Sequence, residues 1–373
     1  MRVLMTGGGT AGHVNPAIAI ANTIKEYENE CEIAFVSSRL ARDKAQDLVP
    51  RAGYELHKVD ILPSYAIWNP KNVLTLFSMA KSRGQARRLI RDFKPDVIIG
   101  TGGFACYPVL NAGAEMGIPT IVHESNAIPG RAVRKLAGKV DLVMVNFESS
   151  AEMLKGAKRV MHVGNPQVVG QKEIVDSDKI AEGFAKSVLI FGGSLGAETL
   201  NRAVADMLVE IARQYEDTEF YHAAGKRDFE ALKAYYAERG LDKRKNVKLV
   251  DYIYDMDARM RRADLVISRA GAMTISELSL LGKAAILVPS PYVAANHQYK
   301  NAKALFDVGA CSLVEEKDFV SGRLIEETKA LLSDSEKRMT MGSGIMNFAK
   351  PNANLLIYEE IKRIIENRKK PNF

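Results

Sequence analysis

The sequence predicts an α/β protein with two similar domains in tandem, each a parallel sheet covered by helices on both faces. Short apolar runs rich in Val, Ile and Leu alternate with helical runs along the chain, which is typical of parallel strands buried on both faces. The two halves also repeat one pattern, because VLMTGGGTAG at 3–12 and VLIFGGSLG at 188–196 both indicate a strand, a glycine turn and a helix. With 373 residues, 47% of them hydrophobic, the chain can fill two cores.

The expected strands follow one another at regular intervals. In the first half they span 2–6, 32–37, 55–59, 96–100, 119–123, 141–145 and 160–163. In the second half they span 187–191, 219–223, 247–250, 264–268, 284–288 and 311–314. A polar stretch at 164–186 separates the two sets, as expected of a boundary between domains. We predict a first domain over 1–165, a second domain over 166–351, and a C-terminal helix at about 352–373 that packs back on the first domain.

Composition argues against several classes of protein. The three cysteines lie far apart and lack a metal-binding spacing, so we expect buried thiols in a reducing compartment. No apolar stretch approaches the roughly 20 residues of a membrane-spanning helix. Because the first strand begins within two residues of Met1, we expect no signal peptide. The net charge of +7 is modest, and without a recognisable binding module it argues against nucleic acid as a partner.

The first glycine turn, GGGTAGH at 7–13, contains the G-x-G-x-x-G spacing of dinucleotide-binding turns. An NAD site also needs an acid at the end of the second strand, whereas here the strand runs into Arg39. Arg39 suits the 2′-phosphate of NADP, so an NADP-dependent oxidoreductase remains an alternative. The equivalent turn at 192–196 lacks that fingerprint. What both turns share is close backbone approach and a following helix whose free amides suit a phosphate or a sugar.

Two further turns follow strands at the same expected edge of the first sheet, GTGGF at 100–104 and HESN at 123–126. Open parallel sheets bind ligands at the carboxyl ends of their strands. His13, His123 and Glu124 are therefore expected to converge there as candidates for acid–base chemistry. Their spacing is not that of the HExxH zinc motif, and we expect no metal.

The second half has a polar cluster at a strand-to-helix junction, SRAGAMTISE at 268–277. A helix that begins near Gly271 directs its N-terminal amides toward an anion, and Glu277 can accept two hydrogen bonds from a ribose diol. The amide side chains in NHQ at 296–298 suit sugar hydroxyls. The acids of DMD at 255–257 open a helix, where acids are ordinary caps, so we do not expect them to hold a metal.

A segment at 61–91 contains no Asp or Glu but six Lys and Arg residues, together with large apolar side chains that include Trp68. Cations beside apolar residues favour attachment to an anionic membrane surface. The alternative is a helix packed on the sheet with a basic outer face, for which Leu89, Ile90 and Phe93 form a suitable stripe.

Eight motifs, taken in order, resemble the MurG family, the N-acetylglucosaminyltransferases of bacterial peptidoglycan synthesis. They are GGGTAGHVNP at 7–16, GTGGF at 100–104, HESN at 123–126, GNP at 164–166, GGSLGA at 192–197, HAAGK at 222–226, RAGAMTISE at 269–277 and NHQYKNA at 296–302. The resemblance implies the GT-B fold, two Rossmann-like domains facing each other across a cleft. It implies an inverting, metal-independent transfer of GlcNAc from UDP-GlcNAc to the 4-hydroxyl of the muramyl sugar in undecaprenyl-linked lipid I, which makes lipid II. A nucleotide-sugar epimerase of similar fold is a further alternative.

The resemblance also implies roles for individual residues. In the second domain, Ser194 is expected to contact the diphosphate of the donor, Ile253 its base and Glu277 its ribose, and Gln298 is expected to contact the GlcNAc. The residues expected to line the nucleotide are Ala272, Met273, Thr274, Ile275 and Ser276. The residues expected to reach the donor from the first domain are Thr10, Ala11, Gly12 and Asn126. The acceptor is expected near Gly8, Gly9, Gly102, Gly103 and His123. His13 is the first candidate for the general base and Glu124 the second, although His13 is equally suited to bind the acceptor.

One position departs from the family pattern. The family commonly has an arginine shortly after Asn-Pro, where this chain has Val168. Either Arg269 or Lys226 is suited to replace that charge, and the sequence does not choose between them. The resemblance further implies that no cofactor is needed and that the protein lies peripherally on the cytoplasmic face of the bacterial cell membrane. Segment 61–91 would then rest on the anionic surface, with other cell-wall synthesis proteins as possible partners.

Overall fold

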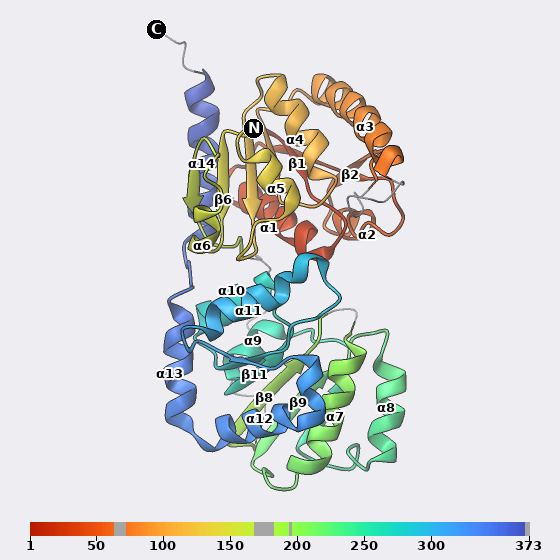
Figure 1. Ribbon diagram of the computed structural model, residues 1–373, viewed down its shortest axis with the longest axis vertical. Helices are drawn as coiled ribbons and strands as arrows, with labels where there is room; N and C mark the ends of the chain where they lie inside the picture. The colour runs from red at the N-terminus through yellow and green to blue at the C-terminus, as the bar shows by residue number, and fades with distance from the viewer. Residues whose placement is uncertain (63–71, 168–182, 194–195, 370–373) are drawn as a thin grey trace. The chain divides into compact units, whose positions relative to one another are not determined.

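The computed structural model describes residues 1–62, 72–167, 183–193 and 196–369. They form two compact units: unit 1 contains Met1–Gly170 and Lys350–Phe373, and unit 2 contains Gln171–Ala349. Each unit is built around one parallel sheet with helices on both sides (Figure 1). The expected fold class, two Rossmann-like α/β domains, is confirmed.

The sheet of unit 1 has seven parallel strands in the order β3-β2-β1-β4-β5-β6-β7. Its strands are β1 Arg2–Thr6, β2 Glu32–Ser38, β3 Glu55–Val59, β4 Val97–Gly100, β5 Thr120–Glu124, β6 Leu142–Val145 and β7 Val160–His162. Its helices are α1 Ala11–Tyr27, α2 Ala45–Arg51, α3 Asn72–Phe93, α4 Cys106–Glu115, α5 Arg131–Leu136, α6 Glu148–Glu152 and α14 Ala353–Lys369. The strand order reverses between β1 and β4, so the loops after these two strands lie where open sheets bind ligands.

The two faces of this sheet are buried in separate apolar clusters because successive side chains along a strand point to opposite faces. In β1, Val3 and Met5 belong to the cluster that contains side chains of α1 and α14, whereas Leu4 belongs to the cluster that contains side chains of α3 and α4. The C-terminal helix α14, blue in Figure 1, packs on α1, and the rings of Tyr27 and Tyr358 stack with centroids 5.0 Å apart.

The sheet of unit 2 has six parallel strands in the order β10-β9-β8-β11-β12-β13. Its strands are β8 Lys186–Phe191, β9 Thr218–Ala223, β10 Val247–Val250, β11 Leu265–Ser268, β12 Ala285–Leu287 and β13 Ser312–Leu313. Its helices are α7 Glu198–Ile211, α8 Phe229–Glu238, α9 Met256–Arg262, α10 Ala272–Leu281, α11 His297–Phe306, α12 Arg323–Ser333 and α13 Ser335–Met346, with short 3-10 turns η2 Ala294–Asn296 and η3 Glu316–Ser321. Here too the order reverses, between β8 and β11.

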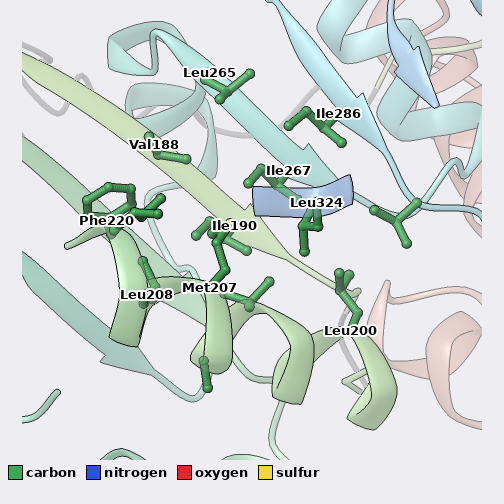
Figure 2. Packing of buried hydrophobic residues seen from close by; sticks show 14 of the residues in the cluster. Val188, Ile190, Leu200, Met207, Leu208, Phe220, Leu265, Ile267, Ile286 and Leu324 are labelled. Atoms are coloured by element: carbon green, nitrogen blue, oxygen red, sulfur yellow. The ribbon is translucent and has the colours of Figure 1, made fainter. Parts of the chain in front are cut away.

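Figure 2 shows the core of unit 2. Val188 and Ile190 of β8 gather with Phe220 of β9 against Leu200 and Leu208 of α7, and all five side chains are fully buried. Burial of large apolar side chains from both sheet and helix is the main force that holds α7 on this face. The N-terminal half of α7 is therefore anchored on this core through Leu200.

The strand predictions are confirmed, since every expected strand is present with ends that differ by one residue at most. Part of the basic segment, residues 63–71 with Trp68, lies outside the described residues. Within the described part of the chain, no helix has both the length and the apolar character needed to cross a bilayer.

Candidate functional site

The loops after β1 and β4 pack backbone against backbone in unit 1. A Cβ added at Gly103 would overlap the carbonyl oxygen of Gly8, and one added at Gly8 would overlap the hydroxyl oxygen of Ser37. Gly9, Gly102 and Gly103 have positive φ angles of 90°, 96° and 80°, which L side chains rarely adopt. Four of the residues predicted at the acceptor are therefore brought together, and their lack of side chains is what permits this approach.

Asp43 holds the first glycine loop from behind. Its buried carboxylate accepts hydrogen bonds from the backbone N–H of Gly9 at 2.8 Å, Ser38 at 3.2 Å and Ala45 at 3.0 Å, and from the hydroxyl of Ser37 at 2.8 Å. Sequence reasoning missed this residue. The only local signal is an acid two residues before α2, which resembles an ordinary helix cap.

His13 lies at the N-terminus of α1 beside these loops. Its Nδ1 is 3.1 Å from the Thr10 hydroxyl, and its carbonyl accepts a 2.6 Å hydrogen bond from the hydroxyl of Thr101. A Cβ added at Gly102 would lie 3.0 Å from Cδ2 of the His13 ring. The half-buried imidazole is thus oriented by Thr10 and lies over Gly102. Ala11 and Gly12 occupy the first turn of the same helix, whose N-cap has no side-chain hydrogen bond, so these amides point toward a prospective ligand.

Replacing Gly103 with alanine is expected to lower the free energy of unfolding of unit 1 by about 3 kcal/mol, because the methyl group overlaps Gly8 and the φ angle is unfavourable. Gly117→Ala is the matched control, since its φ is +75° but nothing lies within 4 Å of the added Cβ. That variant should lose only about 1 kcal/mol. Urea denaturation of both proteins measures the difference, and equal losses would contradict the close packing of the two loops.

His123 and Glu124 hold the β5–α5 turn rather than facing a ligand. The fully buried imidazole of His123 hydrogen-bonds the carbonyl of Gly164 at 2.9 Å, and burial lowers its pKa to about 4. The Glu124 carboxylate accepts hydrogen bonds from the backbone N–H of Gly130 at 2.7 Å and from both the backbone and the side-chain amide of Asn126 at 2.9 and 3.0 Å. Burial raises the pKa of Glu124.

Both residues are already engaged within unit 1. The ring of His123 has no exposed surface, and Glu124 uses both oxygens to shape the loop that carries Asn126. The role of His123 at the acceptor and that of Glu124 as the second candidate base stay predictions. His13 remains the first candidate for the base.

In unit 2, three glycines between β8 and α7 occupy positions that a larger residue would not fit. Gly193 and Gly196 have φ angles of 102° and 89°. A Cβ added at Gly192 would lie 2.5 Å from that of Ala197. Ser194, the residue predicted at the diphosphate, lies outside the described residues, and its role stays a prediction.

The N-terminus of α10 contains the residues predicted at the nucleotide. Gly271 is its N-cap and provides no side-chain hydrogen bond to the first amides, which leaves them available to an anion. Met273 and Thr274 are partly exposed in this first turn, whereas the side chains of Ala272 and Ile275 are buried. Ile275 can therefore contribute only backbone. The Ser276 hydroxyl hydrogen-bonds the carbonyl of Ala272 at 3.1 Å.

Glu277 follows on the same helix and is electrostatically unusual. Within the described part of the chain its carboxylate has neither a hydrogen-bond donor nor a cation as partner. Burial, and secondarily the charge of Asp257, raises the pKa of Glu277 to about 7. A half-buried carboxyl group without a donor is suited to accept hydrogen bonds from a ligand such as a vicinal diol.

Three further candidate residues of unit 2, Gln298, Ile253 and Arg269, differ in their burial and their partners. The Oε1 atom of Gln298 accepts a 2.8 Å hydrogen bond from the backbone N–H of Ser290, which directs the side-chain amide. Ile253 is buried in the loop before α9. Arg269 forms an ion pair with Glu316 and donates to the carbonyl of Val288 at 3.2 Å. Its charge is thus already neutralised.

Lys226 is the other candidate to replace the family arginine. Its Nζ lies 5.7 Å from the ring centroid of Tyr252, at the carboxyl edge of the sheet, and unlike Arg269 it has no acid partner among the described residues. The described residues also contain no group of three or more His, Cys, Asp or Glu side chains arranged to hold a metal ion.

The chain is similar to known proteins along its length. The glycosyltransferase family 28 N-terminal domain matches residues 3–145, and the glycosyltransferase family 28 C-terminal domain matches residues 187–356. A protein of Acetivibrio thermocellus, named UDP-N-acetylglucosamine–N-acetylmuramyl-(pentapeptide) pyrophosphoryl-undecaprenol N-acetylglucosamine transferase, is 38% identical over 374 residues, which are 99% of each chain.

Solved structures agree in fold. The crystal structure of Acinetobacter baumannii MurG superposes with a TM-score of 0.77 at 26% identity and covers 97% of this chain and 99% of that one. A UDP-GlcNAc 2-epimerase from Neisseria meningitidis, crystallised with UDP-GlcNAc, has a TM-score of 0.67 at 14% identity over 97% and 100% of the two chains. At that identity the likeness concerns the fold alone, so the fold by itself does not separate transferases from epimerases.

Proposed function

We propose, because the chain belongs to glycosyltransferase family 28 and within it to the MurG family, that it transfers GlcNAc from UDP-GlcNAc to lipid I and so makes lipid II. The observation that carries this proposal is the 38% identity over 99% of both chains to a protein named for that reaction. The epimerase alternative has only the fold in its favour. The oxidoreductase alternative has one glycine spacing and Arg39, whose guanidinium pairs with Asp60 at 2.9 Å.

Unit 2 is proposed to bind the donor. The uncapped N-terminus of α10 and the glycine turn before α7 place amide dipoles where the negative charge of the departing UDP develops. Glu277 would accept the two ribose hydroxyls, Gln298 would contact the sugar through its oriented amide, and Lys226 would supply a cation near the diphosphate. Backbone of Ile253 is proposed to contact the uracil.

Unit 1 is proposed to bind the acceptor and to supply the base. The glycine loops after β1 and β4 would receive the diphosphate of lipid I, and Thr10, Ala11, Gly12 and Asn126 would reach the GlcNAc of the donor. His13 would accept the proton from the attacking 4-hydroxyl, which opens the way for inversion at the anomeric carbon. Thr10 supports this role because its hydroxyl orients the imidazole through Nδ1.

The basic helix α3 is proposed to rest on an anionic membrane at the cytoplasmic face. Ile90 and Phe93 are buried in the core, so α3 packs on the sheet and presents its polar side outward. The described cations of α3 differ in whether they have an acid partner. Lys81 pairs with Asp60, and Arg83 and Arg87 both pair with Glu115.

Two cations of α3, Arg88 and Arg91, are exposed and have no acid partner among the described residues. The double variant R88E/R91E is expected to bind vesicles of anionic lipid about tenfold or more weakly, since each cation near such a surface contributes about 1 kcal/mol. The control K243E/K245E makes the same change of net charge on an exposed turn of unit 2 and should leave binding unchanged. Cosedimentation measures both, and equal losses would contradict attachment through α3.

The proposed reaction is tested with radiolabelled UDP-GlcNAc and a short-chain lipid I analogue, with and without a chelator. Label is expected to move into the lipid product, with UDP released in equal amount and no loss of rate on chelation. Consumption of UDP-GlcNAc without the lipid would instead identify an epimerase. Absorbance changes of added NADPH would identify an oxidoreductase.

A further inference from the structure

A buried polar chain in unit 2 has no direct part in the proposed chemistry. It runs from Tyr236 of α8 through His222 of β9 to Asn201 of α7. The Tyr236 hydroxyl lies 2.6 Å from Nδ1 of His222, and Nε2 of His222 lies 3.1 Å from Oδ1 of Asn201. All three side chains are at most 2% exposed. Buried polar groups are costly unless each is hydrogen-bonded, and here every one of them is.

The direction of each hydrogen bond follows from the partners of the Asn201 side chain. The Nδ2 atom of Asn201 lies 2.9 Å from the carbonyl oxygen of Ala224 and 3.2 Å from Oδ2 of Asp228. A carbonyl and a carboxylate accept hydrogen bonds, so the Asn201 amide donates to both and its Oδ1 faces His222.

The tautomer of His222 is then determined. Because Oδ1 of Asn201 can only accept, Nε2 of His222 donates, and Nδ1 accepts from the Tyr236 hydroxyl. The imidazole is therefore neutral with its proton on Nε2. Burial, which lowers the pKa of His222 to about 3, keeps the imidazole neutral near pH 7.

The two oxygens that Asn201 holds are the same two against which Gly196 packs. A Cβ added at Gly196 would lie 2.5 Å from Oδ2 of Asp228 and 2.6 Å from the carbonyl oxygen of Ala224. Gly196 closes the glycine turn that opens α7, and the backbone N–H of Asn201 donates to the carbonyl of the next residue, Ala197, at 2.8 Å. The series of buried hydrogen bonds therefore ends at the two oxygens that contact Gly196.

We propose that Tyr236, His222 and Asn201 are positioning residues for Gly196 and the first turn of α7. They hold the Ala224 carbonyl and the Asp228 carboxylate against Gly196, and so direct the first amides of α7 toward the diphosphate of the donor. None of the three is among the residues predicted to contact the substrate. The inference rests on the proposed function, because the donor diphosphate is the ligand assigned to the segment that leads into α7.

The test compares Asn201→Asp with a matched control, Asn246→Asp. Asn246 is also buried in unit 2, and its Nδ2 also donates to two carbonyls, those of Ala212 and Tyr215, both at 3.0 Å. It precedes β10 and therefore lies at the opposite edge of the sheet. Each substitution replaces the donating amide by an oxygen that repels two acceptors. Asn201→Asp also places a second carboxylate beside that of Asp228, so it should lose at least as much stability as the control, and the comparison is made under conditions in which both variants are folded.

Only Asn201→Asp is expected to weaken UDP binding, by about tenfold, and to speed hydrogen exchange of the amides of Gly196, Ala197 and Glu198 in the ligand-free protein. Equal UDP affinity in the two variants, with equal exchange at these three amides, would overturn the inference. If the wild-type protein does not bind UDP at all, the proposed function fails, and the exchange data still decide whether the three buried side chains position the start of α7.

Tyr236→Phe provides a milder variant if Asn201→Asp does not fold. It removes only the hydroxyl that donates a hydrogen bond to Nδ1 of His222. We expect the dissociation constant of UDP to rise by about two- to fivefold. In the wild-type protein, ¹⁵N NMR should find the His222 proton on Nε2. A proton on Nδ1 would reverse the deduced directions and contradict the proposal.

Discussion

His13→Ala is expected to lower kcat by about 10²- to 10⁴-fold, the usual contribution of a general base, while the affinity for UDP-GlcNAc stays within about twofold. The imidazole belongs to unit 1 and is oriented by Thr10, whereas the proposed contacts to the uridine diphosphate of the donor belong to unit 2. The substitution should therefore act on proton transfer and leave donor binding alone. Initial rates with a lipid I analogue and calorimetric titration with UDP-GlcNAc measure the two quantities separately.

Two variants sharpen this experiment. Thr10→Val removes the hydroxyl beside Nδ1 and should lower kcat by an intermediate amount, because the ring loses its orienting contact. His57→Ala is the control, since His57 lies on β3 and is paired only with Glu55. If His13→Ala raised KM for the lipid and left kcat within a few-fold of wild type, His13 would be an acceptor-binding residue and not the base.

Glu277→Gln is expected to weaken the binding of uridine at pH 8 by about 10- to 100-fold, the loss expected when hydrogen bonds to a carboxylate become bonds to a neutral amide. Because the pKa of Glu277 is raised to about 7 by burial, wild-type affinity should rise as the pH increases from 6 to 8 and its carboxyl group ionises. In the variant the affinity should not change over this range. Uridine is the suitable probe because it carries no phosphate that titrates nearby.

The same substitution is expected to stabilise the free protein. The folded state holds a proton on Glu277 up to about pH 7, whereas an unfolded glutamate loses it near its usual pKa of 4.5. The folded state therefore binds more protons in this window, and stability falls as the pH rises through it. Glu277→Gln removes that fall, so its advantage over wild type should grow from near zero at pH 4.5 to as much as about 3 kcal/mol at pH 8.

Urea denaturation at several pH values measures this advantage. A constant difference between the two proteins would show that Glu277 titrates normally. The matched substitution Glu230→Gln, at an exposed position in the first turn of α8 of the same unit, is the control for the change of side chain itself. Loss of uridine affinity together with gain of stability is the combination expected of a residue kept for ligand binding.

The identity of the elements and of the family was determined by the sequence alone. The strands were predictable because each is a short apolar run whose composition is a local property, and the repeated glycine turns indicated two similar sheets. The motifs that resemble the MurG family were likewise contiguous stretches. His13, Glu277 and the glycine loops could be named as candidates for the same reason.

Only the tertiary structure shows the burial and the partners of these candidates. The carboxylate of Glu124 accepts hydrogen bonds from Asn126 and Gly130, and His123 has no exposed surface. No sequence motif indicates the contact of Asp43 with the first glycine loop or the role proposed for Asn201. What each polar side chain can do depends on its burial and its hydrogen-bond partners, and those partners come from distant parts of the chain, which folding brings together only when the sheets and helices pack.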